Sequence, residues 1–259
     1  MEFWHSPLLP QVESRRSCQD ISCYRPHTHD RFSIGLVDSG TTVFTGASGE
    51  PIELAAGDVI LIPAGHVHSC NPRDGRWEYQ MIHAAQDWIL ALAPAAVRMT
   101  DGISIFRDRH LHEQFTAVNE LLFSDADSEQ LESAFRTALT TCATREPHRR
   151  LDDVVDDALV QRLRPVLARL FEARDNPTLD ELAHLAGMGK YQLIRAMKRA
   201  TGFPPVAWLQ NERVGVARKL LRNGHSIADA AHTLGFTDQS HFHRVFRAHV
   251  AATPGAYRR

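Results

Sequence analysis

No apolar run in this chain is long enough to cross a membrane. Stretches such as Val59–Ile62 fall far short of the ~18 residues that a transmembrane helix needs. Residues 1–10 lack the positively charged start of a signal peptide, so we expect a cytoplasmic protein. Cysteine is scarce as well, at four in 259 residues, and no Cys-x-x-Cys pair occurs. In that compartment this argues against a disulfide framework and against a dedicated zinc cluster of cysteines.

A large net charge is also missing, since the formal value at pH 7 is −2. That average conceals a split along the chain. Residues 1–159 carry 13 basic and 24 acidic residues, a net of −11, whereas residues 160–259 carry 16 basic and 7 acidic residues, a net of +9. A basic part beside an acidic part indicates that the basic part binds a polyanion, and nucleic acid is the first candidate.

The first third of the chain is typical of β-structure. Short apolar or β-branched runs alternate with turn-forming Gly, Pro, Asp and Asn, a pattern that favours a sandwich or a barrel. The predicted strands are residues 32–37, 41–44, 51–54, 59–62 and 77–83.

Two amphipathic helices are expected next. Apolar residues recur with helical period from Leu111 to Leu122 and from Leu131 to Cys142. Each stripe needs a cover, and we expect a homodimer formed through one of these helices, with packing inside the monomer as the alternative. Residues 144–158 are predicted as a linker, because their first half shows no apolar helical period.

The basic part contains a diverged internal repeat with an offset of 48 residues. Residues 178–188 align with residues 226–236, and in both copies a capping residue opens a short helix that Gly187 or Gly235 ends. A second helix follows each glycine. The repeat therefore predicts two helix–turn–helix units, over about residues 178–200 and 226–249.

The second helix of each unit offers residues that suit DNA. In such units this helix enters the major groove, where Arg reads guanine and Gln reads adenine, while Lys and Arg also bind phosphate. A helical bundle with solvated basic faces is the alternative, which two units in tandem on the basic part of the chain disfavour. The candidate DNA-binding residues are Lys190, Tyr191, Arg195 and Lys198 in the first unit and Gln239, His243, Arg244 and Arg247 in the second.

Residues 227–258 resemble the signature of AraC-type (AraC/XylS) transcriptional regulators, in the segments IADAA, LGFTDQSHF, RVFR and TPGAYR. The resemblance covers about residues 160–259 and implies a seven-helix DNA-binding domain that acts with RNA polymerase. Ala251 stands where such proteins often have glycine, which predicts a less flexed turn. By similarity, the base contacts fall on Tyr191, Ile194 and Arg195 in the first unit and on Gln239, His243 and Arg244 in the second.

The N-terminal part is similar to the small cupin barrel, a common sensor half of that family, over about residues 23–83. His68 fits the second cupin motif, and His27-x-His29 fits the first in part. Cupins add a Glu to these histidines to bind a metal ion, but Ser33 and Ile34 stand at the Glu positions here. An iron oxygenase would need that carboxylate, so we expect a protein that is not an enzyme.

Two interpretations of the barrel histidines stay open. In the first, His27, His29, His68 and His83 line the pocket of a small-molecule effector as hydrogen-bond partners. In the second, His27, His29 and His68 bind Zn²⁺ or another transition metal, with one coordination position left open.

The sequence thus predicts a two-domain fold. Residues 1–143 are expected to form an all-β cupin-like barrel followed by amphipathic helices, and residues 159–259 an all-α domain with two helix–turn–helix units. The predicted function is sequence-specific regulation of transcription, by activation or by repression. Double-stranded DNA is the expected partner, and a small-molecule effector in the barrel is expected to control its binding. The alternative is a regulator that senses a transition-metal ion through the barrel histidines.

Overall fold

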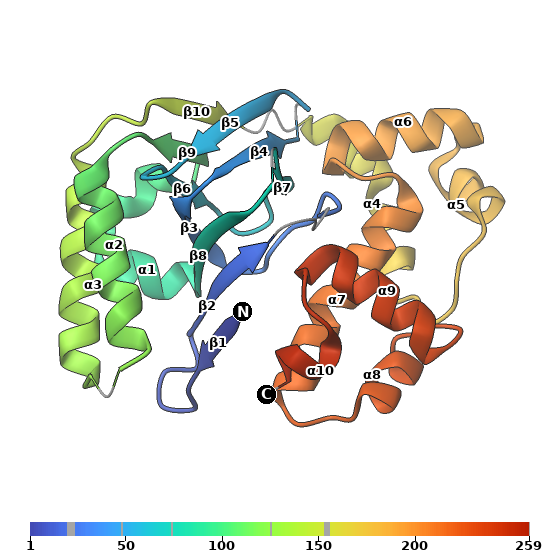
Figure 1. The fold of residues 1–259 in the computed structure, drawn as a ribbon. Helices are drawn as coiled ribbons and strands as arrows, with labels where there is room; N and C mark the ends of the chain where they lie inside the picture. The colour runs from blue at the N-terminus through green and yellow to red at the C-terminus, as the bar shows by residue number, and fades with distance from the viewer. Residues whose placement is uncertain (20–23, 48, 74, 125, 153–155, 259) are drawn as a thin grey trace. The chain divides into compact units, whose positions relative to one another are not determined.

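The computed structural model describes the chain apart from residues 20–23, 48, 74, 125, 153–155 and 259. The described residues divide into a β-rich unit, drawn from residues 1–19 and 28–152, and a helical unit, drawn from residues 24–27 and 156–258 (Figure 1). None of the described helices is long and apolar enough to cross a bilayer. Cys18, Cys70 and Cys142 are free thiols, whereas Cys23 lies outside the described residues.

Two antiparallel sheets build the β-rich unit. One has seven strands in the order β1-β2-β8-β3-β6-β9-β10, and the other has three in the order β5-β4-β7. An apolar cluster with members from both sheets, among them Phe44, Ile62 and Tyr79, lies between them. The strands are β1 Glu2–His5, β2 Val12–Gln19, β3 Phe32–Ser39, β4 Thr41–Gly46, β5 Pro51–Ala55, β6 Val59–Ile62, β7 His68–Pro72, β8 Trp77–Ala84, β9 Gly102–Phe106 and β10 Arg149–Asp152.

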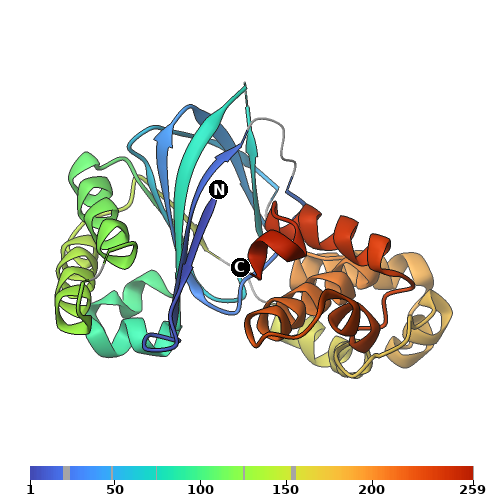
Figure 2. The ribbon, with the colours of Figure 1, turned by 60° about the horizontal axis from the view of Figure 1, so that its bottom comes forward.

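Four helices cover the outer face of the seven-stranded sheet (Figure 2). They are α1 Gln86–Leu92, the 3-10 helix η1 Pro94–Met99, α2 Arg109–Leu122 and α3 Ser128–Ala143. The apolar stripes predicted on α2 and α3 are buried within this unit, with Phe115 and Phe135 fully inaccessible. Packing inside the monomer therefore covers both stripes, and the stripes themselves give no argument for a dimer.

Part of the predicted linker is a strand. Arg149–Asp152 form β10, which pairs with β9 at the edge of the large sheet. The sequence of β10 is RRLD, which has one apolar residue and no alternation, so the sequence contains no sign of a strand that pairs with β9 and packs Leu151 on the apolar cluster.

Seven helices make up the described part of the helical unit. They are α4 Asp157–Phe171, α5 Leu179–Ala186, α6 Lys190–Thr201, α7 Pro205–Arg222, α8 Ile227–Thr233, α9 Gln239–Val250 and α10 Pro254–Tyr257. Both predicted helix–turn–helix units are present, as α5–α6 and α8–α9, with Gly187 and Gly235 at positive φ in the turns. Thr178 and Ser226 cap α5 and α8 as the repeat predicts.

The turn after α9 differs from the prediction. Ala251 has φ 55° and ψ 16°, so the chain turns through the left-handed region although no glycine stands there. No other described non-glycine residue has positive φ. The expectation of a less flexed turn was wrong, because the end of α9 requires this conformation whichever residue occupies it.

Candidate DNA-binding and effector sites

Helix α6 buries one side and exposes the other. Leu193 and Met197 are fully buried against neighbouring helices of the unit. Tyr191 is 79% exposed, and Arg195 and Lys198 are exposed as well. This burial pattern leaves the predicted contact residues available to a partner. Lys190 is exposed and Ile194 is half-buried on the same helix.

An ion pair ties the start of α6 to α5. The Lys190 Nζ lies 2.7 Å from Asp180 Oδ1, and both side chains are at least half exposed. Such a pair contributes little to stability in water. Breaking this ion pair therefore costs little free energy, which leaves the Lys190 ammonium available to a phosphate group.

Helix α9 repeats the arrangement of α6. Phe242 and Phe246 are fully buried, and Val245 is 5% exposed. The candidate contact residues lie on the remaining side, with Gln239, Arg244 and Arg247 exposed and His243 half-buried. Asp238 caps the helix through His241 N–H, and this hydrogen bond lowers the pKa of its carboxyl group.

Buried Arg213 on α7 joins the two helix–turn–helix units. Its Nη1 donates to Asn176 Oδ1 at 2.8 Å, in the segment before α5, and its Nη2 donates to the carbonyl oxygen of Asp175. The same guanidinium lies 5.8 Å from the ring centre of Phe236 in the turn between α8 and α9. Because one side chain contacts both segments, α7 fixes the second unit relative to the first.

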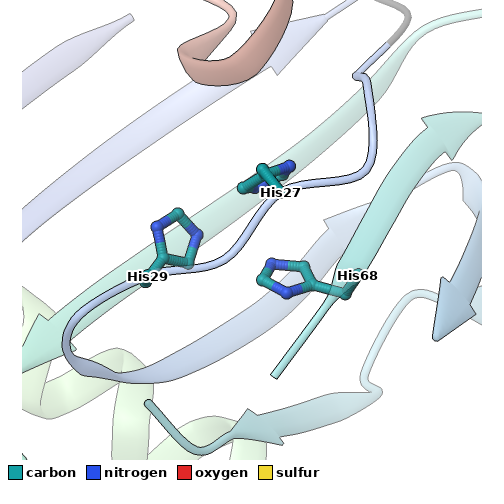
Figure 3. A group of neighbouring side chains, drawn as sticks. All are labelled: His27, His29 and His68. Carbon is teal, nitrogen blue, oxygen red and sulfur yellow. The ribbon is translucent and has the colours of Figure 1, made fainter. Parts of the chain in front are cut away.

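Three histidines come together as the cupin motifs predict (Figure 3). One ligand atom of each of His27, His29 and His68 lies within 4.8 Å of the others. The ring centres of His29 and His68 are 5.1 Å apart, and His83 lies 4.4 Å from His29. All four candidate effector residues therefore belong to one cluster.

Backbone carbonyls orient two of these rings. His27 Nδ1 lies 2.8 Å from Arg25 O, and His68 Nδ1 lies 2.9 Å from His66 O. When Nδ1–H donates to a carbonyl, the ring lone pair sits on Nε2, as in many metal-binding histidines. Burial lowers the pKa of His68 to about 4, so this imidazole is neutral at pH 7. Neutral imidazole is the form that binds a metal or accepts a hydrogen bond.

Ser33 stands at one of the two positions where a cupin would carry its metal-binding Glu. Its Oγ lies 2.7 Å from His83 Nδ1, so this serine orients a histidine and adds no acidic ligand. The resulting donor set of imidazoles suits Zn²⁺, whose nitrogen ligands lie at ~2.0–2.1 Å. The same set also suits hydrogen bonds to an organic ligand.

The polar inner face of β2 escaped the sequence prediction. Residues 12–19 read VESRRSCQ, and Arg15, Ser17 and Gln19 are all buried. Five consecutive residues of this strand, Glu13 to Ser17, are polar, so the sequence has no apolar alternation that would predict a strand here.

Two family models match most of the chain. A family model for an AraC-like ligand binding domain matches residues 10–163, more than half of the chain, and a helix-turn-helix domain model matches residues 182–259. The chain belongs to the AraC family. It is therefore a DNA-binding transcriptional regulator with a ligand-binding domain.

Several relatives in the AraC family match most of the chain. The uncharacterized HTH-type transcriptional regulator YbfI of Bacillus subtilis is 30% identical over 238 residues, which cover 89% of this chain and 85% of YbfI. The transcriptional activator RhaS of Shigella sonnei is 26% identical over 263 residues, which cover 96% of this chain and 88% of RhaS. RhaS is thus a relative that is named as an activator of transcription.

Among solved structures, ToxT from Vibrio cholerae shares the two-unit fold. Its complex with a naphthalenyl-butenoic acid matches with a TM-score of 0.54 at 12% identity, over 96% of this chain and 98% of that chain. At this identity the match shows the fold alone.

Proposed function

We propose that this AraC-family chain reads a two-part DNA sequence with α6 and α9 and that a small molecule in the β-rich unit controls this binding. The observation that carries the proposal is the pair of exposed helix faces, one in each helix–turn–helix unit, in the basic part of the chain. The proposed contacts are Lys190, Tyr191, Ile194, Arg195 and Lys198 on α6 and Gln239, His243, Arg244 and Arg247 on α9.

Selection from a random duplex pool with the full-length protein tests the DNA half of the proposal. We expect two enriched boxes separated by about one helical turn, ~34 Å. Arg195→Ala should erase the preference in one box and Arg244→Ala that in the other, because each arginine is proposed to contact base edges. Arg162→Ala is the matched control, since Arg162 is exposed on α4. Equal loss of both boxes in either single variant, or no enriched sequence at all, contradicts the proposal.

Control by an effector means that the ligand has different affinities for the DNA-competent and DNA-incompetent states. The protein then acts by binding and not by catalysis, and RNA polymerase is its proposed partner at the promoter. The coupling between effector binding and DNA binding is measured with a duplex obtained by the selection. An effector should change the dissociation constant of this duplex, and DNA should change the affinity for the effector by the same factor.

A metal-responsive regulator is the second candidate, and the imidazole cluster of His27, His29 and His68 favours it. Elemental analysis of the purified protein distinguishes a metal-responsive regulator from one that responds to an organic effector. About one equivalent of zinc or another transition metal, lost in His29→Ala and His68→Ala, supports the metal sensor. No bound metal, together with retained DNA binding, leaves the histidines as part of an organic effector site.

A further inference from the structure

The two helix–turn–helix units meet at one junction inside the helical unit. Residues 174–176 lead into α5, the first helix of the first unit. Gly235, in the turn between α8 and α9, lies so close to them that an added Cβ would overlap the carbonyl oxygen of Arg174. Phe236 follows in the same turn and packs on Phe242 of α9, with ring centres 5.1 Å apart. The turn of the second unit therefore lies directly against the segment that leads into the first.

Arg213 of α7 contacts both sides of this junction. Its guanidinium donates to Asn176 Oδ1 at 2.8 Å, to the carbonyl oxygen of Asp175 and, at 3.4 Å, to the carbonyl oxygen of Gly235. The same group lies 5.8 Å from the ring centre of Phe236. The guanidinium is planar and its donors have fixed directions. One rigid group therefore holds the segment before α5 and the turn before α9 at a fixed separation.

A second arginine extends this connection to α4 and α5. Arg169 of α4 donates to the two carboxylate oxygens of Asp175 at 3.0 and 2.8 Å, and to Glu181 Oε1 of α5 at 2.7 Å. Because the carbonyl oxygen of Asp175 accepts from Arg213, Asp175 joins the two guanidinium groups. A continuous series of polar contacts thus runs from α5 to α7, and Phe236 continues it to α9.

Stability alone explains an arginine at position 213 poorly. Arg213 is 7% exposed, and in the described part of the chain its Nε has no hydrogen-bond partner. Burial removes the hydration of the charge, and an apolar side chain of similar volume is often no less stabilising than a buried charged one. An apolar side chain would not, however, hold several acceptors in one geometry. A role in geometry accounts for the arginine better.

We propose that Arg213 is a positioning residue that sets the separation of α6 and α9, and through it the number of base pairs required between the two boxes of the DNA site. This inference rests on the proposed reading of a two-part DNA sequence by α6 and α9. One inserted base pair shifts a box by ~3.4 Å along the duplex and rotates it by about 35°. While Arg213 holds the junction, the second unit cannot follow this displacement, so a misspaced site binds weakly.

Duplexes with altered spacing test this role of Arg213. The two boxes selected by the wild type are placed at the selected spacing or with one or two base pairs inserted or removed, and each duplex is titrated with the full-length protein. We expect one base pair to cost the wild type at least tenfold in affinity. In Arg213→Met this penalty should fall to threefold or less, with unchanged base preferences inside each box. A wild type that binds all spacings alike, or an equal penalty in Arg213→Met, overturns the inference.

Arg218 provides a matched control on the same helix. It is 8% exposed, and its Nε donates to the hydroxyl oxygen of Tyr257 in α10 at 3.2 Å. Arg218→Met therefore also removes a buried guanidinium from α7. We expect this variant to keep the tenfold spacing penalty even where it lowers the unfolding temperature. Equal relaxation of spacing in Arg218→Met and Arg213→Met would trace the effect to general loosening of the helical unit and would refute a specific role of Arg213.

A milder variant keeps the inference testable if Arg213→Met does not fold. Asn176 is exposed, so Asn176→Ala removes one acceptor of Arg213 without a change in the apolar core. We expect Asn176→Ala to reduce the spacing penalty at least twofold. If Arg213→Met is unfolded, an unchanged penalty in Asn176→Ala overturns the inference.

The same measurements distinguish a failure of this inference from a failure of the proposed function. Two boxes whose required spacing is the same for the wild type and Arg213→Met leave the proposed function intact and refute the role of Arg213 alone. Absence of two enriched boxes in the selection with the wild type refutes the proposed function, and the role of Arg213 with it.

Discussion

Ala251 ends α9 in the left-handed conformation, where the Cβ of alanine lies too close to the neighbouring carbonyl oxygen. Glycine avoids that contact but loses more entropy on folding. The balance predicts that Ala251→Gly stabilises the protein by about 0.5–1 kcal/mol. Denaturant unfolding measures this change.

Two glycines serve as opposite controls for Ala251→Gly. Gly187 has φ 59°, and a Cβ there would meet nothing within 4 Å, so Gly187→Ala should destabilise the protein through the backbone alone, by about 1 kcal/mol. At Gly235 the added Cβ would also overlap the carbonyl oxygen of Arg174, so Gly235→Ala should cost more. A lower stability of Ala251→Gly would contradict the argument from backbone conformation.

His249 on α9 predicts how stability depends on pH. Its ring is 4% exposed, and Nδ1 lies 2.8 Å from Val245 O. Burial lowers the pKa of His249 below the ordinary 6.5. Below about pH 6.5, His249 is therefore protonated in the unfolded chain while it stays neutral in the folded chain. The free energy of unfolding falls as the pH falls. We expect unfolding in urea at pH 7.5 and pH 5.5 to show a smaller loss for His249→Gln than for the wild type. His225→Gln, at an exposed site, should lose as much as the wild type.

A chain of buried polar side chains attaches α2 to the large sheet. Asn119 on α2 is fully buried, accepts from Ser14 Oγ on β2 and donates to Gln80 Oε1 on β8. Gln80 Nε2 continues the chain to Asp38 Oδ1 at 2.9 Å. A leucine at position 119 would leave Gln80 Oε1 buried without its donor, and would leave Ser14 Oγ with the carbonyl oxygen of Met81 in place of Asn119. Asn119→Leu should therefore destabilise the β-rich unit by ~2 kcal/mol in denaturant unfolding.

Glu120→Ala provides the comparison for Asn119→Leu, because Glu120 is the next residue on α2 and is exposed. It should change the unfolding free energy by less than about 0.5 kcal/mol. Equal effects at both positions would mean that the polar chain contributes nothing specific to the attachment of α2.

Local sequence signals specify some of the helices and strands and leave others unspecified. The α5–α6 and α8–α9 units could be predicted, because caps, glycines and apolar spacing are local signals that occur twice. Strand β2 could not, since its inner residues are polar and its pairing with β8, which places Arg15 opposite Met81, is not a local signal. The cover of α2 and α3 stayed ambiguous for a related reason, since a stripe such as Leu111–Leu122 does not encode its partner.

Opposite net charges distinguish the two parts of the chain. The net of −11 in residues 1–159 and of +9 in residues 160–259 concentrates phosphate binding in the second part. Because DNA binding releases counterions, the slope of log affinity against log salt counts phosphate contacts, at about 0.9 for each. The position of a basic residue in the chain should therefore decide whether its removal changes this slope.

Lys198 on α6 and Arg247 on α9 are exposed and suit phosphate contacts. Lys198→Gln and Arg247→Gln should each reduce the magnitude of the salt slope by about 1 and weaken selected and scrambled duplexes alike. Arg107→Gln removes an exposed charge from the β-rich unit and should leave the slope unchanged. Titration of the full-length protein with a fluorescent duplex between 50 and 300 mM KCl, at roughly five concentrations, measures all three slopes. If Arg107→Gln changed the slope as much as Lys198→Gln, general attraction by the whole molecule would explain DNA binding, and the basic helical unit would have no special role in it.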